Sequence, residues 1–190
     1  MRIEVREETM DSMEAYARIS AAFRVEEQFV FSCDPSAPPD EVSVASPFVK
    51  DYDALPDNRP AHWPQRFDTS HWRVFAAFVR DTRVGGAVLI PADAHATDRG
   101  VAELWDLRVD DVWRRRGVAR ALWATVEAAA LAGGASALDI ETQQINVAAC
   151  RFYAANGCVL VSVDTSAYPS LPGEVALRWR KVLAARDRAT

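Results

Sequence analysis

Residues 113–122 read WRRRGVARAL and stand between a strand-like stretch and a long apolar helix. The first backbone N–H groups of a helix have no partner inside it, and the helix dipole adds positive potential at that end. Gly117 lets an anion approach the backbone closely, and Ala119 leaves that approach nearly unobstructed. The three arginines of the stretch carry charge that does not titrate at physiological pH. The stretch therefore indicates a binding site for a pyrophosphate.

A second motif follows further along the chain. Residues 137–141 read ALDIE, which is typical of a short strand. Asn146 is a good helix N-cap, and apolar residues follow it at helical spacing as far as Tyr153. The pair Asn156–Gly157 is expected to end this helix, because both residues tolerate the left-handed conformation. The order is therefore strand, Arg–Gly turn, helix, strand and Asn-capped helix, which predicts an α/β fold.

This combination of motifs resembles the GNAT superfamily of acyl-CoA-dependent N-acyltransferases. The resemblance covers about residues 72–182, and its matching residues are Arg114-x-x-Gly117-x-Ala119, Asn146 and Phe152-Tyr153-x-x-x-Gly157. It implies a mixed, mostly antiparallel, twisted sheet that is flanked by helices and splayed at its central strands. It also implies one acyltransferase domain over residues 1–190, with an acceptor-side part at 1–71 and an acetyl-CoA-binding core at 72–182.

The resemblance assigns roles to individual residues around acetyl-CoA, the implied cosubstrate. Backbone amides of the Arg–Gly turn would wrap the pyrophosphate, and Asn146 would contact the pantetheine arm. Tyr153 would protonate the departing thiolate, although an aromatic residue at this spacing can also be plain core packing. Backbone N–H groups of the central strand would polarise the thioester carbonyl, as in an oxyanion hole. The implied cofactor-binding residues are Leu107, Arg108, Val109, Arg114, Arg115, Arg116, Gly117, Val118, Ala119, Arg120, Asn146 and Tyr153.

Three carboxylates are candidates for the acceptor side of the reaction: Glu103, Asp106 and Glu141. Strict alternation along residues 103–109 places Trp105 and Asp106 on opposite faces of the strand. Apolar neighbours would raise the pKa of such a carboxylate toward the range of a general base. We expect Asp106 and Glu141 to bind the acceptor amine, and the choice of general base, including a relay through water, stays open.

A narrower resemblance is to streptothricin (nourseothricin) acetyltransferases. The stretches that carry it are Pro47–Tyr52, Leu138–Gln143, Asn146–Cys150, Asp164–Tyr168 and Glu174–Trp179. It implies direct transfer to a primary amine in a ternary complex, and hence antibiotic resistance. The alternatives are an acetyltransferase for peptide, protein or polyamine amines, and a CoA-binding regulatory module without turnover. We expect no acyl-enzyme at Cys150, because cysteines in helices are usually core residues.

Composition agrees with one globular domain. The chain has 190 residues, 49% of them hydrophobic, and six tryptophans. No apolar run approaches the roughly 20 residues of a membrane span, and the charged N-terminus does not resemble a signal peptide. Cys33, Cys150 and Cys158 are odd in number and lack metal-like spacing, which predicts a cytoplasmic protein with free thiols and no metal. The three histidines, His62, His71 and His95, are expected on the surface or in loops.

The charges are unevenly distributed. Residues 1–70 hold 14 acidic and 7 basic side chains, a balance of −7, whereas residues 71–190 hold 13 and 15, a balance of +2. An acidic acceptor side suits a small cationic amine and argues against nucleic acid as a partner. The alternative is an acidic surface that only keeps the protein in solution. A homodimer is also left open.

The remaining elements are predicted from periodicity and turn residues. A helix is expected over 12–23, a turn over 34–40, a loop over 52–67 and a frayed tail over 184–190. The predicted strands are 3–6, 28–32, 41–49, 72–79, 84–90, 103–109, 137–141, 159–163 and 175–182, and the long helix is 116–131, ended by Gly133–Gly134.

Overall fold

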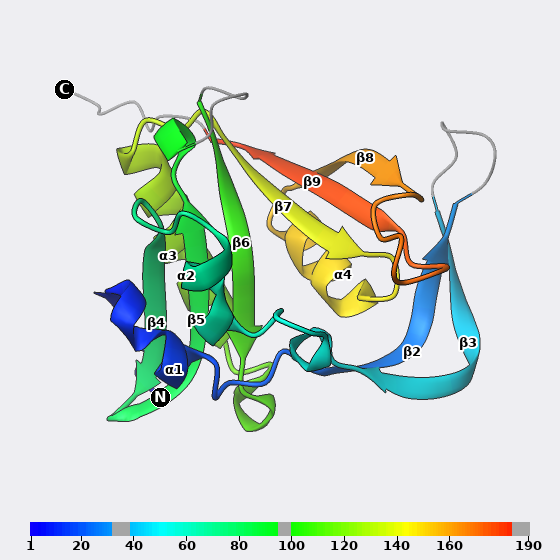
Figure 1. The fold of residues 1–190 in the computed structure, drawn as a ribbon, viewed down its shortest axis with the longest axis horizontal. Coiled ribbons are helices and arrows are strands. Elements are labelled where there is room, and N and C mark those ends of the chain that lie inside the picture. The colour runs from blue at the N-terminus through cyan, green and yellow to red at the C-terminus, as the bar shows by residue number, and fades with distance from the viewer. Residues whose placement is uncertain (32–38, 95–99, 184–190) are drawn as a thin grey trace. The chain divides into compact units, whose positions relative to one another are not determined.

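The computed structural model describes residues 1–31, 39–94 and 100–183 (Figure 1). Cys33, His95, the tail 184–190 and most of the predicted turn therefore lie outside the described residues. The chain divides into two compact units, one of residues 1–21, 51–139 and 182–190, and one of residues 22–50 and 140–181. Both predicted parts of the chain contribute to each unit, and the predicted single domain with its division at residue 71 stays a prediction. No helix among the described residues is long and apolar enough to cross a membrane.

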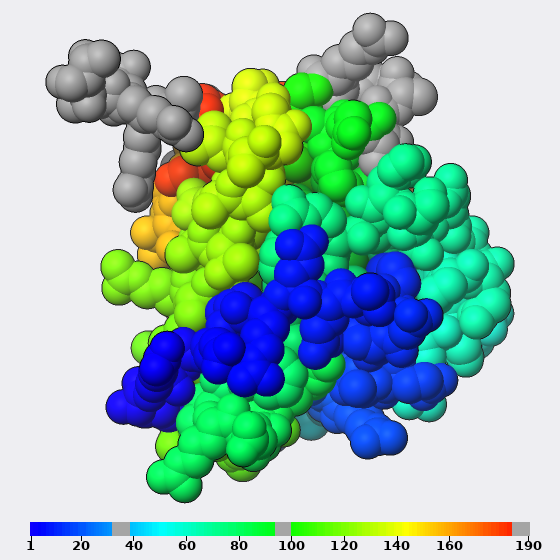
Figure 2. All heavy atoms as spheres, turned by 90° about the vertical axis from the view of Figure 1, so that its left-hand side faces the viewer, coloured from blue at the N-terminus to red at the C-terminus, as the bar shows by residue number. Residues whose placement is uncertain are grey.

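The first unit contains four neighbouring antiparallel strands. Their order is β1 (Glu4–Glu8), β4 (Arg73–Val79), β5 (Thr82–Ile90) and β6 (Val101–Val109). The long helix α3 (Val118–Ala132) contacts all four of them, and the N-terminal segment passes along its flank (Figure 2). The short helices α1 (Met13–Tyr16) and α2 (Trp63–Arg66) belong to the same unit. So do the 3-10 turns η1 (Met10–Ser12), η2 (Tyr52–Ala54), η3 (Pro60–His62), η4 (Ala92–Ala94) and η5 (Asp111–Trp113).

Two adjacent glycines on β5 show why helices can lie on both faces of these strands. A Cβ on Gly85 would lie 3.0 Å from Val118 of α3, whereas a Cβ on Gly86 would overlap the Tyr16 ring of α1 and lie 2.8 Å from its Cδ2 atom. Successive side chains of a strand point to opposite faces, so α3 and α1 cover opposite faces of β5. The missing side chains let both helices approach the strand closely.

The pairing of β5 with β6 contains a β-bulge. Leu89 pairs with Leu104, and Val88 pairs with Asp106, so that Trp105 is the extra residue on β6. A bulge places two residues against one and interrupts the alternation of faces.

The prediction that Trp105 and Asp106 lie on opposite faces is wrong, because the bulge interrupts the alternation at Trp105. The Trp105 ring lies 6.0 Å from the Trp63 ring of α2, and Asp106 accepts a hydrogen bond from Tyr16, whose ring lies 6.3 Å from the same Trp63. Both side chains therefore lie on the face that α1 and α2 cover.

An aromatic core fills that face. Met13, Tyr16, Trp63, Val74 and Val88 are buried together, and Met10, Phe67, Trp72 and Trp105 pack against them while partly buried. Ring centroids of Phe67, Trp72 and Trp105 lie 5.0–5.8 Å apart. Such aromatic pairs stabilise a core beyond the area that they bury.

The second unit contains β7 (Ala137–Gln143), β9 (Ala176–Val182) and β8 (Val159–Asp164), in that order, with helix α4 (Val147–Ala155). The first residues of β7 and the last residue of β9 fall to the first unit. A separate antiparallel hairpin is formed by β2 (Phe23–Val30) and β3 (Asp40–Lys50). The Trp179 indole donates to Thr142 Oγ1 at 3.0 Å, which joins β9 to β7.

Most predicted strands and both long helices are confirmed, and so is the mixed, mostly antiparallel α/β fold. The helix predicted over 12–23 is wrong beyond Tyr16, because α1 ends there and Phe23 already belongs to β2. The predicted loop over 52–67 contains two 3-10 turns, Tyr52–Ala54 and Pro60–His62, and α2. The splay between the central strands concerns how the two units are arranged and stays a prediction.

Candidate functional site

The Arg–Gly turn is built at the end of β6. Asp110 Oδ1 accepts a hydrogen bond from the Val112 N–H at 3.1 Å, which fixes the 3-10 turn Asp111–Trp113. The Arg114 guanidinium then folds back, since its Nε donates to Val109 O at 3.2 Å and its Nη2 lies 2.7 Å from Asp111. Arg114 therefore ties the turn to the strand instead of pointing freely into solvent.

Helix α3 begins with a strained turn. Arg115 has a φ of 59° and Gly117 has a φ of 88°, both in the left-handed region that favours glycine. Gly117 is the N-cap, and a Cβ there would meet only Ile3 at 3.9 Å. The first turn of α3, which lies wholly within the described residues, carries no acidic side chain.

These features fit a pyrophosphate. Residues 114–117 are exposed, so their backbone and the guanidinium groups of Arg115 and Arg116 are open to an anion. The unpaired N–H groups and the dipole of a helix N-terminus favour negative charge. The Arg116 guanidinium lies over the Trp113 ring, 5.4 Å from its centroid, which holds it beside the turn.

Some backbone N–H groups of β6 point toward the edge of the strand that does not face β5. The Asp110 N–H donates to the carbonyl oxygen of Val84 in β5 at 3.0 Å. Since N–H groups alternate in direction along a strand, those of Leu107 and Val109 point away from β5. Their direction is compatible with the predicted contact to a thioester carbonyl, which stays a prediction.

Asp106 belongs to a buried network of charges. Its Oδ2 accepts from the Tyr16 hydroxyl at 2.5 Å and from Arg108 Nε at 2.8 Å, and its Oδ1 accepts from Arg108 Nη2 at 3.0 Å. Arg108 Nη1 also donates to Asp53 at 2.7 Å and to Ile19 O at 3.0 Å. The Arg108 side chain thereby joins the bulge of β6 to the chain after α1 and to the 3-10 turn at residue 53.

The network keeps the Tyr16 hydroxyl neutral and the Arg108 guanidinium charged. Burial and then the charge of Asp106 raise the pKa of Tyr16 well above its usual value. Burial alone would lower the pKa of Arg108, but the charge and hydrogen bonds of Asp106 outweigh it and raise that pKa. Arg108 is 4% exposed, so its guanidinium stays charged among its partners. The Arg108 side chain is therefore engaged by protein groups, and its predicted contact with acetyl-CoA stays a prediction.

Glu141 lies in the second unit and, unlike Asp106, is exposed. Its carboxylate accepts from the Tyr168 hydroxyl at 2.7 Å, and Arg178 Nη2 lies 3.6 Å away. Gln143 Nε2 donates to the same Tyr168 oxygen at 3.0 Å. The Glu141 side chain is 39% exposed, so it is open to a molecule from solution.

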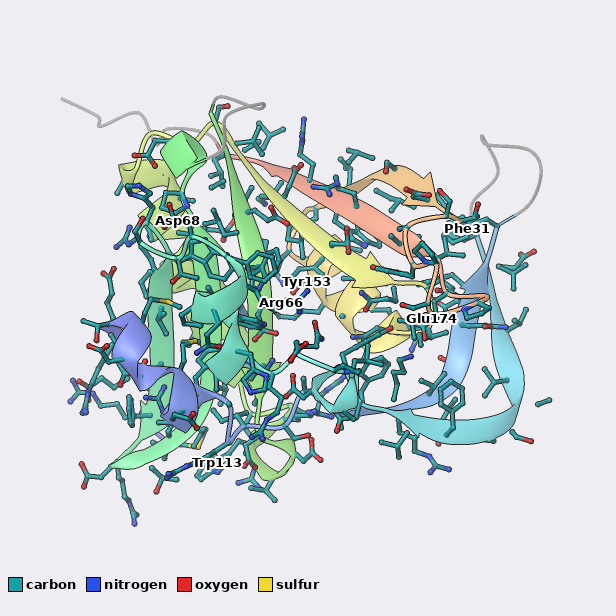
Figure 3. All side chains as sticks on the ribbon, in the orientation of Figure 1. Phe31, Arg66, Asp68, Trp113, Tyr153 and Glu174 are labelled. Atoms are coloured by element: carbon teal, nitrogen blue, oxygen red, sulfur yellow. The ribbon has the colours of Figure 1, made fainter. Side chains whose placement is uncertain are left out.

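Helix α4 places the other two predicted residues. Asn146 is its N-cap, as predicted, and its Oδ1 accepts from the Ala149 N–H at 3.2 Å. Tyr153 lies near the other end of α4, is 6% exposed and contacts the Phe152 ring edge-on at 5.4 Å (Figure 3). The predicted roles of Asn146 and Tyr153 toward acetyl-CoA stay predictions.

Cys150 on the same helix is a buried thiol. Its Sγ lies 3.4 Å from Thr142 Oγ1. Burial raises the pKa of Cys150 to about 11, so the thiol stays protonated at neutral pH. Cys158 is also a buried thiol, and His62 and His71 are exposed, as predicted.

The site residues thus form two groups. Residues 106–109 and 114–120 lie in the first unit, and Glu141, Asn146 and Tyr153 lie in the second. The sequence did not predict that Tyr16 and Asp53 bind side chains of β6, those of Asp106 and Arg108. It also gave no role to Tyr168, although the stretch that contains it, Asp164–Tyr168, is one of those that resemble streptothricin acetyltransferases.

Residues 43–158 match the model of a family described as Acetyltransferase (GNAT) family. Streptothricin acetyltransferase A of Bacillus subtilis (strain 168) is 35% identical over 82 residues, which are 42% of this chain and 47% of that protein. The chain thus spans about half the length of this curated relative.

Solved structures share the fold. A nourseothricin acetyltransferase superposes with a TM-score of 0.77 at 23% identity, over 97% of this chain and 100% of that one. A protein from Bacillus anthracis str. Ames, solved in complex with acetyl coenzyme A, gives a TM-score of 0.75 at 24% identity, over 95% and 99% of the two chains. The ribosomal-protein-S18-alanine N-acetyltransferase from Escherichia coli gives a TM-score of 0.65 at 14% identity, over 100% and 99%.

Proposed function

Because the chain belongs to the GNAT acetyltransferase family, we propose that it moves an acetyl group from acetyl-CoA directly to a primary amine of a streptothricin-type antibiotic. The assignment to this family rests on the match over residues 43–158. The choice of acceptor rests on the partial identity with the Bacillus subtilis streptothricin acetyltransferase and on the matched stretches of sequence.

The Arg–Gly turn is our proposed site for the pyrophosphate of acetyl-CoA. Its support is the exposed N-terminus of α3, with Gly117 at its cap and no acidic residue in its first turn. The proposed contacts are the backbone of residues 114–120 and the guanidinium groups of Arg115 and Arg116. Asn146 would contact the pantetheine arm.

In the proposed reaction the acceptor nitrogen attacks the thioester carbon, so a C–N bond forms as the C–S bond breaks. The N–H groups of Leu107 and Val109 would stabilise the negative charge that develops on the carbonyl oxygen. The Tyr153 hydroxyl would give its proton to the departing thiolate, because a neutral phenol can donate without carrying charge itself. The acceptor amine would lose its proton to a carboxylate or to water.

We propose Glu141 as the carboxylate that binds the acceptor amine. Glu141 is exposed, whereas both oxygens of Asp106 already accept hydrogen bonds from Tyr16 and Arg108. The acceptor-binding role of Asp106 stays a prediction. In our proposal its main effect is to hold the side chain of Arg108 in place. The surplus of acidic side chains in residues 1–70 supports a cationic acceptor. A homodimer and a cytoplasmic location also stay predictions.

The proposal is tested by mass spectrometry of streptothricin after incubation with acetyl-CoA and the protein. We expect one added acetyl group on an amine nitrogen. Initial rates with both substrates varied should give intersecting double-reciprocal lines, as a ternary complex requires. Parallel lines would indicate a covalent acyl-enzyme, and unmodified streptothricin would contradict the acceptor.

A further inference from the structure

The side chains of Tyr168 and Arg178 approach the carboxylate of Glu141, and Gln143 binds Tyr168 in turn. Tyr168 donates its hydroxyl hydrogen to Glu141 Oε1, and Gln143 donates to the oxygen of that hydroxyl. Arg178 approaches the other carboxylate oxygen at 3.6 Å, which is longer than a hydrogen bond. Each carboxylate oxygen accepts about two hydrogen bonds, so this arrangement leaves Glu141 able to accept from a further donor.

The chain that carries Tyr168 is anchored firmly between β8 and β9. The buried Gln144 side chain donates to Gly173 O and accepts from the Val175 N–H, both at 2.7 Å. Lys50 forms an ion pair with Glu174, and both side chains are about 15% exposed or less (Figure 3). These anchors hold the backbone at residues 173–175. The Glu174 N–H donates to Leu171 O and the Leu171 N–H donates to Tyr168 O, which links the anchored backbone to Tyr168.

Tyr168 remains a hydrogen-bond donor over the whole working range of pH. Burial raises the pKa of its phenol above the usual value, and the charge of Glu141 acts in the same direction. A permanent donor on one oxygen restricts the rotation of the Glu141 carboxylate. The other oxygen is thereby held in a defined direction, as recognition of one particular ammonium group requires.

We propose that Tyr168 is a positioning residue that orients Glu141 for the cationic amine of the acceptor and so contributes to acceptor specificity. This inference rests on the proposed function, because it takes Glu141 as the acceptor-binding carboxylate. It adds the chain between β8 and β9 to the parts of the protein that select the amine.

The test compares Tyr168→Phe with the wild-type protein and with Ser166→Ala as a matched control. Ser166 lies on the same loop, and its hydroxyl also donates to a carboxylate, that of Asp164 at 2.7 Å. We expect Tyr168→Phe to raise KM for streptothricin about tenfold, the usual effect of one hydrogen bond to a charged group, and to leave KM for acetyl-CoA unchanged. Ser166→Ala should match the wild type in both constants.

A double-mutant cycle with Glu141→Gln separates positioning from general stability. Tyr168→Phe should have little further effect on KM in the Glu141→Gln background, because the group that Tyr168 orients is already altered. An equal effect in both backgrounds, or an equal rise in KM for acetyl-CoA, would overturn the inference.

The outcomes also separate this inference from the proposed function. A wild-type protein that acetylates streptothricin, with a Tyr168→Phe variant equal to Ser166→Ala, would overturn the inference and leave the proposed function intact. If the wild type acetylates only another amine, the same constants are measured with that amine, and the same criteria apply. A wild-type protein that turns over no amine would overturn both.

Discussion

Among single residues, Gly117 at the N-cap of α3 is the one on which the proposed binding of acetyl-CoA depends most. Gly117→Glu should abolish CoA binding, because the new carboxylate blocks the phosphate approach and repels its charge. Calorimetry with CoA measures the effect. Gly134→Glu is the matched control, since Gly134 also has a positive φ, 81°, and a Cβ there would meet no atom of the described residues within 4 Å, but it lies beyond the other end of α3. It should bind CoA as the wild type does, and retained affinity in Gly117→Glu would remove the pyrophosphate assignment.

Tyr153 is the proposed proton donor to the thiolate. Tyr153→Phe should lower kcat by about 10²- to 10⁴-fold, the usual contribution of a general acid, with both KM values nearly unchanged. The phenylalanine ring keeps the contact with Phe152, so the melting temperature should change little. Wild-type kcat in this variant would show that Tyr153 acts only in packing.

Cys150 should not take part in the reaction. Cys150→Ala should keep most of kcat and lose about 1 kcal/mol of unfolding free energy, because the thiol is buried and its raised pKa keeps it protonated near neutral pH. Steady-state rates and thermal melts measure the two effects. A collapse of turnover in a variant that melts normally would point to a covalent mechanism.

At the scale of elements, the close approach of α1 to β5 depends on Gly86. Gly86→Ala should destabilise the protein by about 1–3 kcal/mol, because the new Cβ would overlap the Tyr16 ring and displace the donor to Asp106. Thermal melts measure this. Gly133→Ala is the control, since Gly133 has a φ of −79° and its Cβ would lie 3.4 Å from helix carbonyls. Equal melting temperatures for the two variants would contradict the packing argument.

Elements with local signals could be predicted from the sequence. Asn146 caps α4 and Gly157 follows its end with a φ of 79°, as their residue types predict. Capping depends on one side chain and its near neighbours, so it is readable without knowledge of the fold. The Arg–Gly turn before α3 could be placed for the same reason.

Other elements could not be predicted because distant contacts decide them. Met13, Tyr16 and Ile19 are all buried, as a helix over 12–23 would require, but α1 ends at Tyr16 and the chain then leaves the helix. The bulge at Trp105 has no local signal, since it appears only in the pairing of β6 with β5. For that reason the aromatic face and the partners of Asp106 could not be predicted either.

At the scale of the whole molecule, the net charge of −5 conceals the contrast between the acidic first part and the basic remainder. In our account the basic turn before α3 meets the phosphates of acetyl-CoA, and acidic groups meet a cationic amine. The Arg–Gly turn lies in the first unit and Glu141 in the second. A cationic small molecule is therefore the acceptor class that the charge distribution favours.

The measurement that tests this account most directly is thiol release from acetyl-CoA with streptothricin, and with lysine, spermidine and a Lys-containing peptide in parallel. We predict rapid release with streptothricin and slow release with the other amines. Release only with the peptide or with spermidine would keep the GNAT family and contradict the proposed acceptor. CoA binding without thiol release with any of the amines would show that the protein does not acetylate cationic antibiotics.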